Sequence, residues 1–431
     1  MADMRTAVER LRRAIERREK VLIYGDYDVD GTMAVVVLLT ALRALGTRVE
    51  TFIPHRLTDG YGMRVPIIER AAAEGYRVVL SVDTGIREHA AIDRARELGV
   101  DCIVTDHHLP DEHLPSACAI LNPLRPDCGY PEKNLSGVGV AFKLAQALLA
   151  PRLSERMVES YLKVVALGTI ADVVPLVGEN RVIAHFGLAG LREPVHQGLG
   201  ALLEVAGLRG RAVTAGDVGF RLAPRLNAAG RMESAQDVID LFTLLDAGKT
   251  RQIAERLDSL NRERQQVEEQ ILGEIVELME TQPQRQGRYS LVFGGEGWHR
   301  GVIGIVAQRV AERYHRPALV IGVEDGAGQG SGRSIPKFHL LKALTHCGSL
   351  FERYGGHAQA AGFTLAAGRI PDLEIAFETY ARGVLSPEDL EPALRVDAEI
   401  ALEDLTWDFH QALNVLAPHG PGNPTPVFAA Q

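Results

Sequence analysis

Short apolar runs alternate with helical patterns along the first part of the chain. The apolar runs predict strands at residues 21–24, 49–53, 77–82 and 101–105. Between them, apolar side chains at helical spacing predict helices at residues 32–45, 64–74 and 87–98. Continuous apolar runs are typical of the buried strands of a parallel sheet. The pattern therefore predicts a doubly wound α/β domain with right-handed crossovers.

The rest of the chain is predicted to be helical first and then α/β again. A helical region opens with Gly-Val-Gly-Val at residues 137–140 and continues through residue 191. Residues 247–279 carry apolar side chains at helical spacing and predict one long helix, which at 1.5 Å per residue spans about 45 Å. A second α/β unit is expected from residue 289 to about residue 385. The predicted fold class is α/β: two α/β domains, the first with a parallel sheet, joined by the long helix with a groove between them.

Composition places the chain among ordinary globular proteins, and its length predicts at least two domains. Of its 431 residues, 46% are hydrophobic and 24% are charged. No apolar run is long enough to span a bilayer and the N-terminus has no signal-peptide pattern, so we expect a cytoplasmic protein. The four cysteines form no Cys-x-x-Cys pair, which suits reduced thiols.

The net charge of −9 is unevenly distributed. Between Ser386 and Asp408 there are eight acidic residues against one basic residue, Arg395. By contrast, residues 209–231 hold five arginines and a single acid, Asp217. A basic surface on an acidic protein is a reasonable footprint for a phosphate polymer, although uneven surface charge without any partner explains the pattern equally well.

Acidic and histidine side chains follow three of the predicted strands. They are Asp26, Asp28 and Asp30 after residue 24, Asp83 after residue 82, and Asp106, His107 and His108 after residue 105. Parallel sheets bind ligands at the carboxyl ends of their strands, so these groups are expected at one edge. In an extended segment the first three aspartates would project from one face, although one of them could instead cap the helix expected near Thr32. Clustered carboxylates repel one another, which makes a divalent cation site the natural resolution.

Other known motifs fit these residues less well than a site for Mn²⁺ or Mg²⁺ does. An EF-hand would need Glu where the chain has Val37, and no P-loop is present. Asp83 alone would more often be a turn residue, whereas two adjacent histidines at a strand end seldom serve packing. Asp172 adds a carboxylate within an apolar run, where an unpaired charge is costly. Mixed carboxylate and imidazole ligands fit Mn²⁺ or Mg²⁺ and favour Mn²⁺, and no cysteine joins them, which argues against structural zinc.

Several motifs together resemble those of one superfamily. Four segments resemble the motifs of the DHH phosphoesterases: residues 25–31 (GDYDVDG), 81–85 (SVDTG), 105–108 (TDHH) and 168–173 (GTIADV). Within this superfamily, a resemblance to the RecJ single-stranded-DNA exonucleases rests on residues 224–231, 297–307 and 330–334. Residues 355–362 are similar to the glycine-rich motif of the DHH-associated domain. The resemblance covers nearly the whole chain.

The resemblance implies roles for individual residues. The implied ligands of two metal ions, Mn²⁺ preferred or Mg²⁺, are Asp28, Asp30, Asp83, His107 and Asp172. Asp26 and His108 fall in the same motifs and are implied to be further metal ligands or residues that support the ligands. Catalysis is expected to depend on Asp83, His107 and His108. A pocket for a 5′-terminal phosphate is implied for Arg56 and Tyr61. The residues implied to hold the substrate are Arg225, Asn227, Arg231, His299, Ser331, Arg333, Ser334, Gly356 and His357. For Ser331, Arg333, Ser334 and His357, a glycine-rich packing loop is the alternative.

Domain boundaries are implied as well. The DHH catalytic domain is expected at 1–246, the connecting helix at 247–282, the DHH-associated substrate-binding domain at 283–385, and an acidic segment with a connector at 386–431. Related exonucleases continue into an oligonucleotide-binding barrel after a segment like residues 420–424, and we expect that barrel to be absent here.

The function implied by the resemblance is 5′→3′ hydrolysis of single-stranded DNA to 5′-mononucleotides by two metal ions, in DNA repair and recombination. The expected partners are single-stranded DNA and a single-strand-binding protein or a helicase, with no membrane, and the expected state is a monomer. One alternative is a DHH phosphodiesterase acting on short oligoribonucleotides or cyclic dinucleotides. The long helix and residues 225–231 argue against it. The other is a non-catalytic replication scaffold, against which the retention of every candidate ligand speaks.

Overall fold

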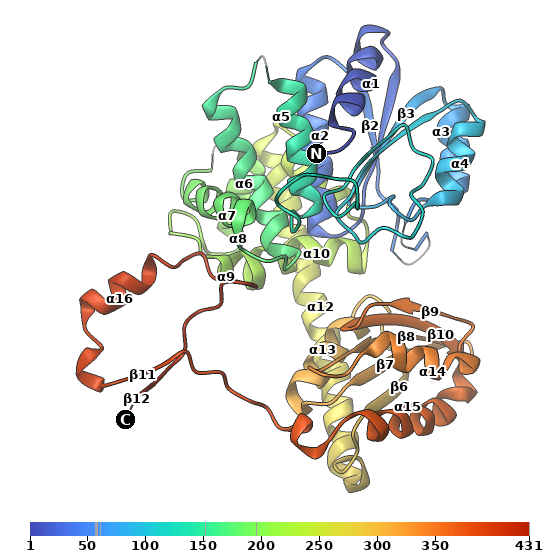
Figure 1. Cartoon of the computed structure of the whole chain (residues 1–431), viewed down its shortest axis with the longest axis vertical. Coiled ribbons are helices and arrows are strands. Elements are labelled where there is room, and N and C mark those ends of the chain that lie inside the picture. The colour runs from blue at the N-terminus through green and yellow to red at the C-terminus, as the bar shows by residue number, and fades with distance from the viewer. Residues whose placement is uncertain (57–58, 61, 151, 195, 431) are drawn as a thin grey trace. The chain divides into compact units, whose positions relative to one another are not determined.

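The structure is a computed structural model that describes residues 1–56, 59–60, 62–150, 152–194 and 196–430. The chain forms two compact units: unit 1 comprises Met1–Asn261 together with Val396–Gln431, and unit 2 comprises Arg262–Arg395. Each unit has a five-stranded sheet of its own, and helix α12 (Ala247–Thr281) passes from unit 1 into unit 2 (Figure 1). None of the helices in the described ranges combines the length and the apolar character that crossing a membrane requires.

In the five-stranded sheet of unit 1, every neighbouring pair of strands is parallel. The strand order is β2 (Arg48–Phe52), β1 (Lys20–Tyr24), β3 (Tyr76–Val82), β4 (Asp101–Thr105) and β5 (Ala119–Leu121). The four predicted strands are confirmed, and β5 is an addition whose three residues are too few to form a recognisable pattern. Because β3 is the central strand, a residue that follows it lies in the middle of the sheet edge.

Helices cover both faces of this sheet, as predicted for a doubly wound fold (Figure 1). On one face, α1 (Met4–Glu16), α2 (Val29–Ala44) and α5 (Gly137–Leu149) share a core with alternate strand residues. On the other face, α3 (Val65–Ala73) and α4 (His89–Glu97) cover a second core. Burying an aliphatic side chain contributes roughly 1.5–3 kcal/mol, so the two cores hold the strand ends firmly in place.

A helical region completes the main body of unit 1. Its helices are α6 (Glu155–Ala171), α7 (Gly178–Leu191), α8 (Gln197–Val205), α9 (Ala215–Asp217), α10 (Ala223–Met232) and α11 (Gln236–Thr243), with a π-helical turn η1 (Val218–Leu222) before α10. Helix α6 packs against α2 and α7 and begins at the cap residue Ser154, whose side chain accepts the N–H of Met157. It ends at Asp172, which is thereby brought close to the sheet edge.

Unit 2 contains a mixed sheet. The strand order is β6 (Leu291–Glu296), β7 (Ala318–Glu324), β8 (Ala327–Arg333), β10 (Ala360–Ala366) and β9 (Arg353–Gly356). Strands β6 and β7 are parallel, and the other neighbouring pairs are antiparallel. Besides the part of α12 from Arg262 onward, the α-helices of this unit are α13 (Ile303–Tyr314), α14 (Leu340–His346) and α15 (Ile370–Val384). A Cβ at Gly330 would lie 2.1 Å from the Phe363 ring, so the glycine-rich strand β8 lets this ring pack directly on its backbone.

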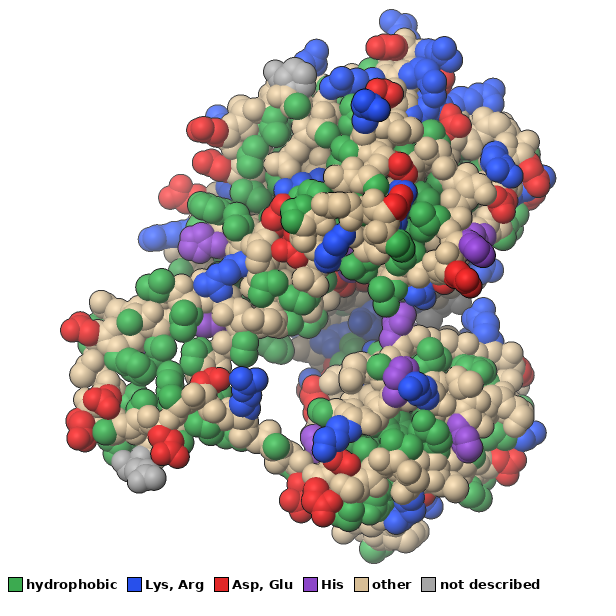
Figure 2. Space-filling model, in the orientation of Figure 1, with side chains coloured by type: hydrophobic (Ala, Val, Ile, Leu, Met, Phe, Trp, Pro, Cys, Tyr) green, Lys and Arg blue, Asp and Glu red, His purple; other side chains and the backbone are tan. Residues whose placement is uncertain are grey.

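The C-terminal segment of unit 1 forms a parallel pair, β11 (Ala398–Ile400) and β12 (Phe428–Ala430), and helix α16 (Trp407–Asn414). It contacts the helical region through the carbonyl of Pro421, which accepts the N–H of Leu176 at 2.7 Å. Large apolar side chains are exposed on this segment (Figure 2). Among them, Trp407 is 73% exposed.

Candidate metal centre

Strands β1, β3 and β4 end at the same edge of the unit 1 sheet, and an acidic residue follows each of them. Asp83 follows β3, and its N–H donates to Thr105 O at 2.9 Å, which continues the ladder with β4. Asp106 follows β4 and donates in the same way to Leu121 O at 3.0 Å. Asp26 comes shortly after β1. The parallel sheet therefore gathers these residues at one edge, as the strand pattern predicts.

The segment that carries Asp26, Asp28 and Asp30 is extended at Asp28 but helical at Asp30, so the expectation that the three side chains project from one face of an extended segment is wrong. Helix α2 begins at Val29, so Asp30 lies in its first turn. Asp28 is the N-cap residue, and its Oδ1 accepts the N–H of Gly31 at 2.9 Å. Such a cap stabilises a helix by about 1 kcal/mol, which explains why α2 begins earlier than the predicted residue 32. The prediction that one aspartate caps this helix is confirmed.

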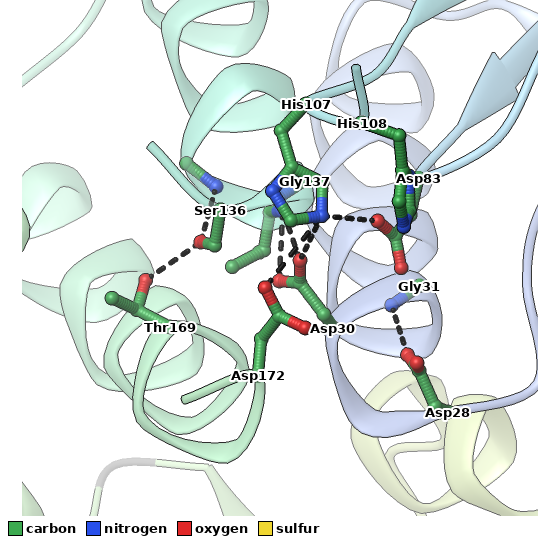
Figure 3. A network of polar contacts seen from close by, with 12 residues as sticks. Asp28, Asp30, Gly31, Asp83, His107, His108, Ser136, Gly137, Thr169 and Asp172 are labelled. Atoms are coloured by element: carbon green, nitrogen blue, oxygen red, sulfur yellow. Dashed lines mark hydrogen bonds and ion pairs between the residues drawn. The ribbon is translucent and has the colours of Figure 1, made fainter. Parts of the chain in front are cut away.

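Carboxylates from separate elements surround the ring of His107 (Figure 3). Its Nε2 lies 3.1 Å from Asp83 Oδ1, 3.6 Å from Asp172 Oδ2 and 3.8 Å from Asp30 Oδ2. Among the described residues, the groups whose ligand atoms lie within 4.8 Å of one another are Asp83, His107 and His108; Asp30, His107 and Asp172; and Asp26, Asp28 and Asp83. Asp83 and His107 each belong to two groups, so the three groups form one continuous metal centre.

Backbone N–H groups orient Asp30, a contact that reasoning from the sequence missed. Its two carboxylate oxygens accept the N–H of Gly137 at 2.6 Å and the N–H of Val138 at 3.0 Å, at the start of α5. The start of a helix attracts negative charge, so this contact stabilises the ionised carboxylate. The glycine pattern at 137–140 is the available signal, because a Cβ at Gly137 would lie 2.5 Å from Asp83 Oδ1.

Burial and mutual repulsion favour the protonated form of most carboxyl groups in the centre. Burial raises the pKa of Asp30 to about 7, and the charge of Asp28 adds to the shift. Burial likewise raises the pKa of Asp172 to about 10, with a further contribution from Asp30. The pKa values of Asp26 and Asp83 are also raised, first by burial and then by neighbouring carboxylates. A bound cation would reverse these shifts, because it favours the ionised form of each ligand.

His107 is suited to act as a neutral ligand. Burial lowers its pKa to about 4, so the ring is uncharged near neutral pH and can offer a lone pair. Within the described part of the chain, neither His107 Nε2 nor Asp83 Oδ1 has a hydrogen-bond partner, although both atoms are buried. Leaving a buried polar atom unsatisfied costs about 1–3 kcal/mol, which an ion bound by both atoms would offset. The donor set of oxygen and imidazole atoms therefore fits a divalent cation such as Mn²⁺ or Mg²⁺.

Asp106, which the sequence placed at this edge without a role of its own, positions His108. Its Oδ1 lies 2.7 Å from His108 Nδ1, and the same oxygen accepts the N–H of His107 at 2.7 Å. Burial is the largest single influence and lowers the pKa of His108. The hydrogen bond with Asp106 and the charges of the nearby carboxylates together outweigh it, so the pKa is raised. The His108 side chain is 37% exposed, so it can contact a substrate bound at the metal centre.

Arg56 is the described member of the expected 5′-phosphate pocket. Its guanidinium carbon lies 4.9 Å from the centre of the Tyr27 ring, and its charge acts on the nearby Asp26. A ring face beside a guanidinium holds the cation without consuming its hydrogen-bond donors. Tyr61, the other expected member, lies outside the described residues.

Helix α10 carries three of the expected substrate ligands, and two of them make contacts that support the fold. Asn227 Oδ1 accepts the N–H of Val29 at 3.2 Å and so holds the start of α2. Arg225 is largely buried and pairs with Asp258 of α12 at 2.9 Å. Arg231 lies in the last turn of α10. The basic stretch predicted from the sequence is therefore partly neutralised within unit 1, and substrate contacts by these residues stay a prediction.

In unit 2, the structure brings three expected substrate ligands to one end of the sheet. At the end of β8, Arg333 Nη1 donates to Ser331 Oγ at 3.1 Å. Arg333 faces Ala360 of β10, and the carbonyl of Ala360 accepts the N–H of His357 at 2.8 Å. Polar side chains from β8 and from the turn between β9 and β10 therefore lie together.

The remaining expected ligands of unit 2 make local contacts. His299 Nδ1 accepts the N–H of Gly301 at 3.1 Å, and Ser334 Oγ donates to Phe338 O at 2.6 Å. Gly356 has a φ of 146°, and a Cβ there would lie 2.5 Å from Ala360 O, so close backbone approach requires glycine at this position. A substrate role for these residues stays a prediction.

Three known domain families match successive parts of the chain. The N-terminal domain of the DHH family matches residues 20–169, and the DHHA1 domain matches residues 286–383. The RecJ OB domain matches residues 396–431, the segment for which an acidic connector is predicted.

The chain is also similar over almost its whole length to proteins named single-stranded-DNA-specific exonuclease RecJ. It is 40% identical to the Bacillus subtilis (strain 168) protein, covering 99% of this chain and 54% of the relative. It is 38% identical to the Dickeya dadantii (strain 3937) protein, covering 98% of this chain and 77% of the relative. The crystal structure of RecJ in complex with Mn²⁺ from Thermus thermophilus matches with a TM-score of 0.87 and 33% identity, covering 99% of this chain and 61% of that one. The chain thus spans about half the length of the Bacillus relative.

Proposed function

Because the chain belongs to the RecJ family of single-stranded-DNA-specific exonucleases, we propose that it hydrolyses single-stranded DNA from the 5′ end and releases 5′-mononucleotides. The observation that carries this proposal is the buried centre around His107, where two carboxylate-rich groups of potential ligands adjoin one another. Adjacent ligand groups of this kind suit a two-metal hydrolytic site. Repair and recombination of DNA are the proposed settings of the reaction.

Two divalent ions, Mn²⁺ in preference to Mg²⁺, are proposed for the centre. The proposed ligands are Asp26, Asp28 and Asp83 for one ion and Asp30, His107 and Asp172 for the other, with Asp83 placed between the two. When bound, such ions activate a water molecule and stabilise the charge that develops on the phosphate. The imidazole ligand favours Mn²⁺. The Thermus relative is known in complex with Mn²⁺ and also with Mg²⁺, so both ions suit a centre of this family.

The side chains of this protein prepare the site in three ways. Asp30 is oriented before any ion binds, because two backbone N–H groups hold its oxygens. His107 is neutral and needs no deprotonation to act as a ligand. His108, held by Asp106 and with a raised pKa, can carry a proton at its ring and donate a hydrogen bond to a phosphate oxygen. Burial of the carboxylates limits access of bulk water and strengthens each of these interactions.

The 5′ polarity is proposed to come from Arg56. A guanidinium can meet a terminal phosphate with two hydrogen bonds, and the Tyr27 ring supports this guanidinium from one side. A terminal phosphate monoester carries more negative charge than an internal diester, so this cation favours a phosphorylated 5′ end. Tyr61 is proposed to add a hydroxyl donor to the same pocket.

Contacts to the rest of the strand are proposed for both units. In unit 2, Ser331, Arg333 and His357 offer hydroxyl, guanidinium and imidazole donors at one end of the sheet, which supports a role in gripping the DNA backbone. The other proposed substrate ligands are Arg225, Asn227, Arg231, His299, Ser334 and Gly356. A single-strand-binding protein or a helicase as partner, a monomeric state and a cytoplasmic location belong to the same proposal.

A digestion experiment with three substrates tests the function. Single-stranded DNA, duplex DNA and dinucleotides, each with a 3′ label where possible, are incubated with the protein and Mn²⁺. We expect 5′-mononucleotides from the single strand alone, no hydrolysis in EDTA, and recovery with Mn²⁺ at least as good as with Mg²⁺. Cleavage restricted to short oligoribonucleotides or cyclic dinucleotides would favour a different phosphodiesterase, and strand binding without any hydrolysis would favour a scaffold.

A further inference from the structure

We propose that the turn formed by residues 416–423 is a brace that positions Asp172 within the metal centre. The inference rests on the proposed function, because it assumes that Asp172 is a metal ligand. It adds a role for the C-terminal segment, which matches the RecJ OB domain and is far from Asp172 in the sequence.

Backbone hydrogen bonds join this turn to the chain immediately after Asp172. The carbonyl of Pro421 accepts the N–H of Leu176 at 2.7 Å. From the first turns of α7, Arg181 Nη2 donates to the carbonyl of Leu416 at 2.8 Å and to that of Ala417 at 3.3 Å. The turn therefore contacts the chain both before and after the start of α7, within ten residues of Asp172.

One side chain organises the turn itself. Asn423 Nδ2 donates to the carbonyls of Leu416 and Pro418, each at 2.8 Å. The backbones of Gly420 and Asn423 also pair with each other, at 2.9 and 3.0 Å. A Cβ at Gly420 would lie 2.7 Å from Leu176 Cδ1, so glycine permits the turn to lie directly against the chain that it holds.

The chain after Asp172 needs such a restraint because its backbone is strained. Val173 has a φ of 61°, in the left-handed region that β-branched residues rarely adopt. Strain of this kind costs about 1–3 kcal/mol and persists only where the surroundings impose it. Packing of the Val173 side chain does not impose it, because the side chain is 65% exposed. The residues that follow are fixed instead, since Leu176 is 1% exposed and hydrogen-bonded to Pro421.

The restraint acts on a ligand whose position otherwise depends on the packing of α6. Asp172 ends α6, where its N–H donates to Gly168 O at 2.9 Å, and its side chain is 23% exposed. If residues 173–177 relax, the helix end is free to change direction and Asp172 Oδ2 moves from its position 3.6 Å from His107 Nε2. A second restraint comes from Asn180 Nδ2, which donates to Pro175 O at 3.1 Å. Loss of the brace should therefore weaken metal binding and not abolish it.

Two variants of the full chain test the brace, each with a matched control. Asn423→Ala removes both hydrogen bonds that organise the turn, and Arg181→Ala removes the contact from α7. The controls are Asn414→Ala, at an exposed asparagine of α16, and Arg192→Ala, at the exposed C-cap of α7. Affinity for Mn²⁺ is measured by electron paramagnetic resonance without DNA, and the unfolding midpoint is measured in EDTA. We expect Asn423→Ala to bind Mn²⁺ about tenfold more weakly, at the lower end of effects seen for residues that orient ligands, with a smaller loss for Arg181→Ala and no loss for the controls.

Unchanged Mn²⁺ affinity in both variants would overturn the brace, even if the unfolding midpoint in EDTA falls, because that result would assign the turn a purely structural role. Should Asn423→Ala fail to fold, Arg181→Ala decides the question alone. The test is separate from that of the proposed function. If the variants bind Mn²⁺ more weakly but the unsubstituted protein digests no DNA, the brace is supported and the exonuclease is refuted. If the unsubstituted protein digests DNA but the variants bind Mn²⁺ normally, the exonuclease is supported and the brace is refuted.

Discussion

Two buried acidic clusters, one in each unit, differ in the side chains that surround them. In unit 2, Glu268 is 1% exposed, and its carboxylate is paired with Arg264 on the same helix and with Arg309 of α13. In unit 1, Asp30 and Asp83 are buried to a similar depth, but the side chains around them are other carboxylates and the neutral ring of His107. A buried charge is tolerated only when it is paired, neutralised or bound to a metal.

The difference shows how a structural carboxylate can be told from a functional one. The fold itself supplies the cations that neutralise Glu268, and these ion pairs join α12 to α13. In the unit 1 centre, protons or cations from solution have to neutralise the carboxyl groups. The raised pKa values of Asp30 and Asp172 reflect this shortage of positive charge. Burial without an internal counter-charge is thus the physical signature of the metal site.

Removing a charge from the unit 1 centre should have the largest effect on activity and little effect on the fold. Asp83→Asn keeps the shape, and Asn tolerates the left-handed backbone at this position, where φ is 58°. We expect hydrolysis of single-stranded DNA to fall by about a thousandfold or more, because the residue proposed to lie between the two ions loses its charge. The metal-free protein should unfold at no lower temperature, since Asn resembles the protonated acid that burial already favours. Near-normal activity of a folded variant would contradict the two-metal assignment.

The matching substitution in unit 2 should do the opposite. Glu268→Gln leaves Arg264 buried without its partner charge, so the free energy of unfolding should fall by about 3 kcal/mol. Urea denaturation measures the loss, and exonuclease activity per folded molecule should remain. Glu269→Gln, at the exposed neighbour on the same helix, is the control and should change stability by less than about 0.5 kcal/mol. Equal stability of the two variants would mean that the Glu268 cluster contributes nothing.

Arg56 differs from the arginines around Glu268, because this cation beside the unit 1 centre is proposed to bind the substrate and not to stabilise the fold. Arg56→Ala should reduce cleavage of 5′-phosphorylated strands roughly 10- to 100-fold, as expected for the loss of a charge-assisted pair of hydrogen bonds. Cleavage of 5′-hydroxyl strands should change far less. Rates on the two 3′-labelled substrates are compared with those of Arg64→Ala, a change at an exposed arginine. Equal losses on both ends, or shortening from the 3′ side, would refute the pocket.

The smallest expected effect is on the pH dependence of stability, which should also distinguish the two kinds of buried acid. Asp172 has a folded pKa of about 10, well above its ordinary value, so between about pH 5 and 9 its carboxyl group holds a proton in the folded state that it lacks in the unfolded state. In EDTA, the free energy of unfolding should therefore fall as pH rises, by about 1 kcal/mol per pH unit. Below about pH 7.5, His107 opposes this trend, because its folded pKa of about 4 lies below its ordinary value of 6.5. Above about pH 7.5 the ring is neutral in both states and adds little.

Urea denaturation at three pH values, with EDTA or with Mn²⁺, measures this slope. Mn²⁺ should flatten it, because the ion replaces the protons, and Asp172→Asn should reduce it in EDTA. Stability that rises with pH in the metal-free protein would show that the acids of unit 1 are already compensated.

Local pattern in the sequence determined much of the fold. Apolar runs identified β1 to β4, and helical spacing identified α12 from its first residue almost to its last. The acidic and histidine residues after those strands could be assigned to one edge, because parallel strands must end together. These inferences succeed because the period of side chains along a strand or helix depends only on local backbone geometry.

Tertiary structure alone decided how the ligands are held. Asp30 lies on a helix and not on a strand, and the N–H groups that orient it belong to Gly137 and Val138, more than a hundred residues later. Arg225 was expected to meet DNA, yet it pairs with Asp258, and the turn at 416–423 contacts the chain after Asp172. No periodicity encodes such contacts, because they join distant segments and depend on which surfaces pack together when the chain closes its long loops. The sequence therefore determined which residues could bind a metal, and packing determined where each of them lies and what holds it there.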